Sequence, residues 1–179
     1  MKNFPSYFIK PHSALFMDRD GVINRLLPND YIKQISEFEL LEDTIPALSL
    51  FKKLFARIFI VTNQQGIGKG LMINSIDEIH TFFLSKLPPS LHPDKIYHCP
   101  HLTSDNCVCR KPKPGMALMA KNDFPDIELT SSIIVGDSLS DMEFGQNAGM
   151  NTAFISSLEN ETHQSFENLL SFANFLTPK

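Results

Sequence analysis

Two aspartates, Asp18 and Asp20, stand two positions apart directly after an apolar run. Such a pair can divide the work of a group transfer, because one carboxylate can attack as a nucleophile while its neighbour exchanges protons with the leaving group. Gly21 follows them and allows the backbone to turn tightly beside a ligand. An ordinary acidic turn at the end of a strand has the same letters, so this segment alone leaves both interpretations open.

A second polar segment begins at Thr62 and Asn63, again at the end of an apolar run, and continues with Gln64 and Gln65. Three glycines at positions 66, 68 and 70 come close behind. A hydroxyl beside exposed backbone N–H groups can cradle a phosphate. The alternative is a simple turn or helix N-cap, which uses the same residue types.

A third segment places Arg110 and Lys111 in a stretch stiffened by prolines at 112 and 114. Arginine can bind a phosphate with two parallel hydrogen bonds, and lysine supplies a compact charge that offsets repulsion between an anionic nucleophile and an anionic substrate. A solvated basic run is the alternative interpretation.

The fourth segment carries Asp137 after an apolar run, with Asp141 four residues later. Mg²⁺ prefers a few carboxylate oxygens and keeps water or substrate oxygens, so Asp18, Asp20 and Asp137 could form one magnesium site. For Asp141 we favour a structural role as a helix cap or first-turn acid.

The elements that must position these residues alternate between short apolar runs and amphipathic stretches, the pattern of a parallel sheet flanked by helices. We expect five parallel strands, at 13–17, 57–61, 95–98, 132–135 and 151–155. Helices are expected after the cap at Asp43 and Thr44, after the capping box from Ser75 to Glu78, after Gly115, from 140 to 148, and around 166–173. Two irregular segments, 24–42 and 98–114, follow predicted strands at the edge where α/β sheets bind ligands.

Length and charge limit the possible classes of protein. The 179 residues suit one domain, and a formal net charge of −4 disfavours non-specific binding to nucleic acid. No stretch is long and apolar enough to span a bilayer, so we expect no membrane partner and a cytoplasmic location. We also expect a monomer with a doubly wound, Rossmann-like α/β sheet over residues 1–179 and no room for a large cap domain.

The three cysteines lie close together, as Cys99, Cys107 and Cys109, and His101 lies among them. Three thiolates and one imidazole complete a tetrahedral Zn²⁺ site and leave no position for a catalytic water, which predicts a structural zinc in a loop over about 98–110. The alternative is three free cysteines that cluster by chance. We expect the competing His98 to lie on the strand side, and His12, His80, His92 and His163 to lie on the surface.

The four polar segments occur in one order, each at or just after a strand end, and together they resemble the motifs of the haloacid dehalogenase superfamily of phosphohydrolases. The runs at 18–24, 61–67, 109–116 and 135–137 are similar to those of the D-glycero-D-manno-heptose 1,7-bisphosphate phosphatases, with histidinol-phosphate phosphatases as the nearest relatives. The length between His101 and Cys107 is more like the histidinol-phosphate enzymes.

The resemblance implies a role for each matching residue. Asp18 would be the nucleophile that forms an aspartyl-phosphate, and Asp20 the acid and then the base. Mg²⁺ would be held by the carboxylates of Asp18 and Asp137 and by the backbone carbonyl of Asp20. The phosphoryl group and the substrate would be bound by Thr62, Asn63, Gln64, Gln65, Arg110 and Lys111.

The sequence therefore predicts a Mg²⁺-dependent phosphatase that removes the C7 phosphate from a small phosphorylated sugar, a heptose 1,7-bisphosphate. A histidinol-phosphate phosphatase is the alternative within the class. An inactive phospho-ligand-binding module is the alternative outside it.

Overall fold

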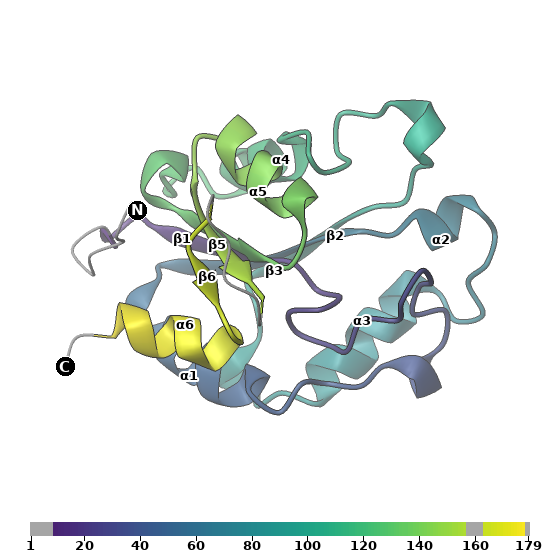
Figure 1. Ribbon diagram of the computed structural model, residues 1–179, viewed down its shortest axis with the longest axis horizontal. Coiled ribbons are helices and arrows are strands. Elements are labelled where there is room, and N and C mark those ends of the chain that lie inside the picture. Colours follow the sequence, from purple (N-terminus) through teal and green to yellow (C-terminus); the bar gives the residue numbers. More distant parts are fainter. Residues whose placement is uncertain (1–8, 157–162, 178–179) are drawn as a thin grey trace.

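The computed structural model describes residues 9–156 and 163–177. Within these residues the centre of the fold is a parallel sheet of six strands in the order β3-β2-β1-β4-β5-β6 (Figure 1). The strands are β1 (Ala14–Met17), β2 (Arg57–Asn63), β3 (Lys95–Cys99), β4 (Ile133–Gly136), β5 (Asn151–Ile155) and β6 (Ser165–Phe166).

The five predicted strands are confirmed, with ends that differ by no more than two residues. The predicted count of five is wrong, because β6 adds a sixth strand at the edge beside β5. This strand has two residues, both half-buried, so it presents no apolar run for sequence periodicity to detect.

Helices cover both faces of the sheet, as predicted for a doubly wound fold (Figure 1). On one face α1 (Thr44–Leu54), α3 (Ile76–Ser85) and α6 (Leu169–Leu176) enclose a core with Leu15 and Met17 of β1. On the other face α4 (Gly115–Asp123) and α5 (Leu139–Asn147) pack with Ala14 and Phe16. A strand buried on both faces has apolar residues at every position, which explains the continuous apolar run of β1.

Short helical turns lie in the connections. They are α2 (Gln65–Gly68) and the 3-10 helices η2 (Ile35–Glu37), η3 (Pro89–Leu91), η4 (Thr103–Asp105) and η5 (Leu129–Ser131). In the described part of the chain no large cap domain interrupts the connections that follow β1 and β2. No helix of the described residues is long and apolar enough to cross a membrane.

The helix starts follow the local sequence. The predicted capping box of α3 is confirmed, since the Ser75 hydroxyl accepts from the N–H of Glu78 and the Glu78 carboxylate accepts from the N–H of Ser75. Helix α1 begins where the cap at Asp43 predicted it, but the Asp43 carboxylate accepts instead from the N–H of Leu170 in α6. That hydrogen bond joins two helices on the same face of the sheet.

The order of the strands creates the position for a site. Strand β1 lies between β2 and β4, at the point where the strand order reverses: β2 and β3 extend the sheet on one side, and β4, β5 and β6 extend it on the other. The carboxyl ends of β1, β2 and β4 then meet at one edge, where open α/β sheets bind ligands.

Candidate active site

Asp18 lies at the carboxyl end of β1, and its N–H donates to the carbonyl of Val135 in β4 at 2.9 Å. Its side chain is nearly buried, and one carboxylate oxygen accepts from the ammonium of Lys111 at 2.7 Å. Burial raises the pKa of Asp18 to about 8, and the neighbouring carboxylates of Asp141 and Asp137 add to the rise while Lys111 opposes it. The strand end thus fixes one carboxyl group beside one cation.

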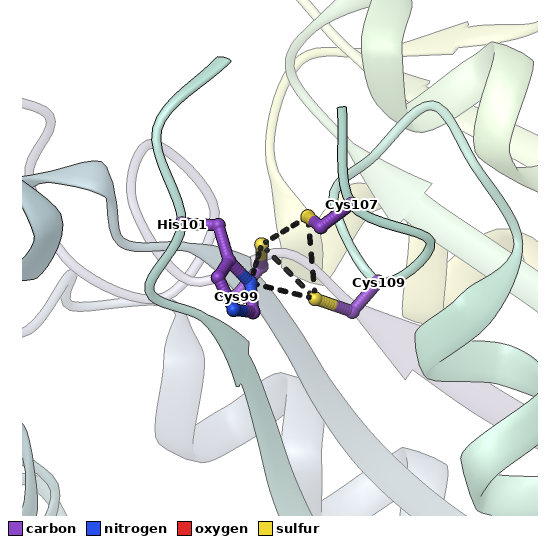
Figure 2. A group of neighbouring side chains, drawn as sticks. All are labelled: Cys99, His101, Cys107 and Cys109. Atoms are coloured by element: carbon purple, nitrogen blue, oxygen red, sulfur yellow. Dashed lines mark hydrogen bonds between the residues drawn. The ribbon is translucent and has the colours of Figure 1, made fainter. Parts of the chain in front are cut away.

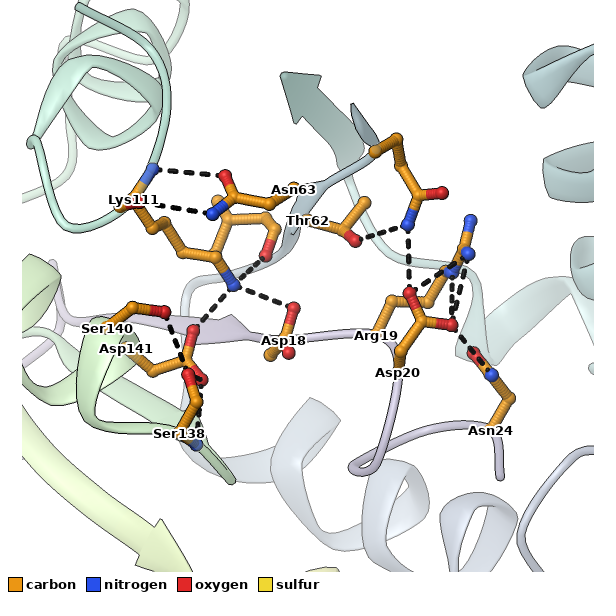
Figure 3. A network of polar contacts seen from close by, with 12 residues as sticks. Asp18, Arg19, Asp20, Asn24, Thr62, Asn63, Lys111, Ser138, Ser140 and Asp141 are labelled. Atoms are coloured by element: carbon orange, nitrogen blue, oxygen red, sulfur yellow. Dashed lines mark hydrogen bonds and ion pairs between the residues drawn. The ribbon is translucent and has the colours of Figure 1, made fainter. Parts of the chain in front are cut away.

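The ammonium of Lys111 lies between two carboxylates (Figure 3). It donates to Asp18 at 2.7 Å, to Asp141 at 2.5 Å and to the carbonyl of Val61 at 2.9 Å, and the residue is 4% exposed. Burial works against the charged form, but the two carboxylates outweigh it and hold the pKa of Lys111 above its ordinary value. All three hydrogen-bonding positions of the ammonium are therefore used.

Asp141 has a second partner besides Lys111. Its other carboxylate oxygen accepts from the N–H and the hydroxyl of Ser138, at 3.1 and 2.6 Å, and so caps α5. The predicted structural role of Asp141 is confirmed by this capping box. The ion pair with Lys111 was not predicted from the sequence.

The Asn63 side chain forms hydrogen bonds with both the backbone N–H and the backbone carbonyl of Lys111. Its side-chain oxygen accepts from the N–H of Lys111 at 3.0 Å, and its amide nitrogen donates to the carbonyl of Lys111 at 3.1 Å. The end of β2 therefore fixes the loop that carries the lysine (Figure 3).

Three carboxyl groups gather at the edge of the sheet and could hold a cation. Oxygens of Asp18, Asp137 and Asp141 all lie within 4.8 Å of one another. Burial raises the pKa of Asp137 to about 6, and Asp141 adds to the rise. Oxygen donors with this surplus of negative charge suit a hard divalent cation such as Mg²⁺.

The loop after β1 closes over this group only because residue 21 is glycine. Its φ is +91°, and a Cβ at this position would lie 1.9 Å from a carboxylate oxygen of Asp137. A side chain at residue 21 would displace the Asp137 carboxylate.

The Asp20 side chain points away from the carboxyl groups of Asp18 and Asp141 (Figure 3), and it is not part of the group that Asp18, Asp137 and Asp141 form. It accepts from the Arg19 guanidinium at 3.0 to 3.3 Å, from the Asn24 amide at 2.9 Å and from the Gln64 amide at 2.8 Å. Burial works in the opposite direction, but the charge of Arg19 and these hydrogen bonds hold the pKa of Asp20 below its ordinary value. The structure thus joins Asp18 and Asp137 with Asp141, and not with the carboxylate of Asp20.

The remaining predicted residues take different positions. Thr62 is buried, and its hydroxyl accepts from the Gln64 amide at 2.8 Å, so Gln64 links Thr62 to Asp20. Arg110 is half-buried, and its Nη1 atom has no hydrogen-bond partner among residues 9–156 and 163–177.

Gln65 joins the loop that carries Tyr31 to the loop that carries Thr103. Its amide nitrogen donates to the Tyr31 hydroxyl at 3.1 Å, and its oxygen accepts from the N–H and hydroxyl of Thr103 at 2.7 and 2.8 Å. The two irregular segments predicted from the sequence therefore meet at this glutamine.

Cys99, His101, Cys107 and Cys109 form a cluster at the end of β3 (Figure 2). The three sulfur–sulfur distances are 3.2, 3.4 and 3.5 Å, and Nδ1 of His101 lies 3.3 Å from Cys109 and 3.6 Å from Cys99. A zinc tetrahedron with Zn–S bonds of about 2.3 Å has edges of roughly 3.8 Å, so the four ligand atoms fit around one such ion with little movement. His98 is outside this cluster and packs against His80 instead.

Two residues beside the site were missed by the sequence analysis. The first is Arg19, which is completely buried. The second is His80, predicted to be on the surface but in fact buried on α3, with Nε2 3.2 Å from Nη1 of Arg19. A signal was available, because His80 lies on the same helical stripe as the buried Ile76, Ile79 and Phe83.

Comparison with known proteins gives consistent matches. Residues 108–166 match the family described as HAD-hydrolase-like. The chain is 39% identical to a D-glycero-alpha-D-manno-heptose-1,7-bisphosphate 7-phosphatase from Campylobacter jejuni, over 93% of this chain and 96% of the relative. It is 36% identical to a D-glycero-beta-D-manno-heptose-1,7-bisphosphate 7-phosphatase from Escherichia coli K12, over 78% of this chain and 76% of the relative.

A solved structure has the same fold. The D,D-heptose 1,7-bisphosphate phosphatase from B. bronchiseptica, complexed with magnesium and phosphate, superposes with a TM-score of 0.79 at 27% identity. The match covers 92% of this chain and 97% of that one.

Proposed function

This chain belongs to the haloacid dehalogenase-like hydrolases, in the family of the heptose-1,7-bisphosphate 7-phosphatases, and from that membership we propose that it removes the C7 phosphate of a D-glycero-D-manno-heptose 1,7-bisphosphate. The observation that carries the proposal is the buried ammonium of Lys111 beside Asp18 at the carboxyl end of β1. A carboxylate with this partner can approach a phosphate monoester without prohibitive repulsion.

In the first step an oxygen of Asp18 attacks the phosphorus, and the bond between phosphorus and the C7 oxygen breaks. The product is an aspartyl-phosphate on Asp18. The departing sugar oxygen takes a proton from the carboxyl group of Asp20, whose low pKa in the free protein is raised by the negative charge of the bound phosphate, and leaves as the alcohol. Splitting the hydrolysis in this way replaces one difficult step with two easier ones.

In the second step the Asp20 carboxylate accepts a proton from a water molecule, whose oxygen attacks the phosphorus of the aspartyl-phosphate. The bond between phosphorus and the Asp18 oxygen breaks, phosphate leaves, and both aspartates return to their starting states. One residue serves both steps because it lies beside the leaving oxygen and then beside the water.

We assign the magnesium ligands to the Asp18 and Asp137 carboxylates and to the backbone carbonyl of Asp20. When bound, Mg²⁺ supplies charge that stabilises the oxygens of the transferring phosphoryl group. Lys111 adds a second positive charge, and Asp141 holds that lysine while capping α5. The surplus of buried carboxylates supports this assignment.

The substrate contacts are assigned to Thr62, Asn63, Gln64, Gln65 and Arg110 with Lys111. The unpartnered Nη1 of Arg110 supports a substrate role for that residue, since a buried guanidinium nitrogen without a hydrogen bond is unfavourable. Gln65 acts mainly by joining the two loops that border the substrate.

We assign a structural Zn²⁺ to Cys99, His101, Cys107 and Cys109. Four protein ligands complete its coordination, so it takes no part in the reaction. Its contribution is to fix the loop in which Arg110 follows Cys109. A single domain over residues 1–179, a cytoplasmic location and a monomeric state stay predictions from the sequence.

The test is phosphate release from the α and β heptose 1,7-bisphosphates and from histidinol phosphate, with Mg²⁺ and with EDTA. We expect Mg²⁺-dependent release from at least one heptose anomer, and both are included because relatives are named for each. Asp18→Asn should abolish release without unfolding the protein. Preference for histidinol phosphate would replace the substrate, and binding without turnover on all three would indicate a phospho-ligand-binding module.

A further inference from the structure

Arg19 is a charged residue with no exposed surface, placed between the two aspartates of the first segment. Its Nε and Nη2 atoms donate to the Asp20 carboxylate, and its Nη1 atom contacts Nε2 of His80 at 3.2 Å. A buried cation is strongly destabilising unless its donors are satisfied. The guanidinium therefore depends on two partners, one in the site and one on α3.

The contact between Arg19 and His80 fixes the protonation state of the His80 imidazole. Arginine has only donors, so Nε2 of His80 must accept and carry no proton, which places the imidazole proton on Nδ1. Burial lowers the pKa of His80 to about 3, and the charges of Arg19 and His98 add to the effect. A neutral His80 is thus the partner that Arg19 needs across the physiological pH range.

The arrangement bears on how Asp20 works. Three other carboxyl groups, Asp18, Asp137 and Asp141, already lie within 4.8 Å of one another. A proton-transferring carboxyl group must be held apart from them, at a defined distance from the leaving oxygen, because small displacements of a catalytic group cost large factors in rate. The Nε and Nη2 atoms of Arg19 hold the Asp20 carboxylate, and the contact of Nη1 with His80 fixes the orientation of the guanidinium.

We propose that His80 is a positioning residue for catalysis, which orients the Arg19 guanidinium and through it places the Asp20 carboxyl group for proton transfer to the leaving oxygen. The inference rests on the proposed function, since it needs Asp20 to act as the acid. It also links α3, which carries no other proposed site residue, to the reaction.

The test compares two substitutions of nearly equal size. His80→Gln keeps an oxygen that can accept from Arg19, whereas His80→Met replaces it with a thioether, a weak acceptor. Each variant is assayed for kcat/KM on a heptose 1,7-bisphosphate, whose alcohol leaving group needs a proton, and on p-nitrophenyl phosphate, whose phenolate leaves with little help. The ratio kcat/KM reports the reaction up to the first irreversible step, where the leaving group departs.

We expect His80→Met to lower kcat/KM on the heptose substrate by about tenfold or more and on the aryl ester by no more than about threefold, because general acid catalysis contributes roughly 10² to 10⁴-fold where a proton is needed. His80→Gln should recover most of the loss. Equal losses on both substrates, no loss, or a glutamine variant no better than the methionine variant would overturn the proposal, since a purely structural histidine predicts those results.

Phosphate release by the wild-type protein distinguishes failure of this proposal from failure of the proposed function. If it releases no phosphate from either heptose anomer, the proposed function fails, and the same comparison is made with glycerol 3-phosphate as the alkyl ester. If His80→Met does not fold, Arg19→Lys takes its place, because lysine lacks the fork and should show the same selective loss.

Nitrogen NMR of the His80 imidazole tests the contact without any turnover. A proton on Nδ1 and a bare Nε2 are expected, and a proton on Nε2 would overturn the proposal.

Discussion

Replacement of Lys111 by methionine removes the cation that lies between two buried carboxylates. Breaking a buried ion pair by removing one partner typically costs about 3–5 kcal/mol. Lys111 is 4% exposed and its ammonium makes three hydrogen bonds, so little solvent screening reduces that figure. For a domain of this size the loss corresponds to a fall of roughly 6–20 °C in the unfolding temperature.

The stability lost in Lys111→Met should depend on pH in a direction that the pKa of Asp18 determines. Lys111 lowers the pKa of Asp18, which burial has already raised to about 8, so the substitution raises that pKa further. A carboxyl group whose folded pKa lies above its unfolded value of about 3.9 loses stability as the pH rises from that value toward the folded pKa. Below about pH 7 both proteins lose stability with pH at the same rate, so the deficit of Lys111→Met relative to the wild type should grow only as the pH rises through the wild-type pKa of about 8.

Thermal unfolding is followed by circular dichroism without added Mg²⁺ at pH 6.5, 8 and 9.5, and phosphate release is measured with Mg²⁺. Activity should fall by about 10² to 10³-fold, the usual loss when one charge-stabilising group is removed. Lys113→Met is the matched control, because its ammonium donates to the carbonyl and the side-chain oxygen of Asn106 in the same loop and its loss should cost under about 1 kcal/mol. Equal unfolding temperatures for Lys111→Met and the wild type at pH 8 would refute the reasoning.

Three further results are expected. Mg²⁺ affinity should rise between pH 5 and pH 8, because burial raises the pKa of Asp137 to about 6 and that of Asp18 to about 8, and bound metal displaces their protons. Calorimetry in two buffers measures the number of protons released on binding. An affinity that does not change with pH would contradict this prediction. Gly21→Ala should weaken Mg²⁺ binding in the same titration, because its Cβ would displace the Asp137 carboxylate. Gly70→Ala is the control: its φ is +68° and the space around its Cβ is open, so it should cost only about 1–2 kcal/mol of backbone strain in thermal unfolding. Equal Mg²⁺ affinities for the two variants would count against the contact with Asp137. Metal analysis should find one zinc per chain, and Cys107→Ser should lower that content and raise KM more than it lowers kcat; full zinc content in the variant would exclude this thiolate as a ligand.

The strands could be predicted because each is an apolar run between polar or turn-forming residues, and β6 could not because Ser165 and Phe166 form no run. The location of the polar residues at one edge of the sheet could also be predicted, because the carboxyl ends of parallel strands lie on the same side. The ion pair of Lys111 with Asp141 joins residues 30 positions apart, and no local pattern specifies which of several carboxylates a lysine will reach. His80 is a different case, because its place on the apolar stripe of α3 was visible and a buried histidine was the better prediction.

The position of the Lys111 ammonium depends on two attachments of one polar loop. Asn63 fixes the backbone at Lys111 itself, and the cysteine and histidine cluster fixes the chain at Cys109, two residues earlier. Ordering each residue of such a loop costs about 1–2 kcal/mol, and this loop buries few apolar side chains that could offset the cost. A tetrahedral zinc site can supply the missing stabilisation, since structural zinc contributes on the order of 10 kcal/mol to folding. We therefore expect loss of the proposed zinc to weaken the charge neutralisation of Asp18 by Lys111 as well as the hold on substrate by Arg110.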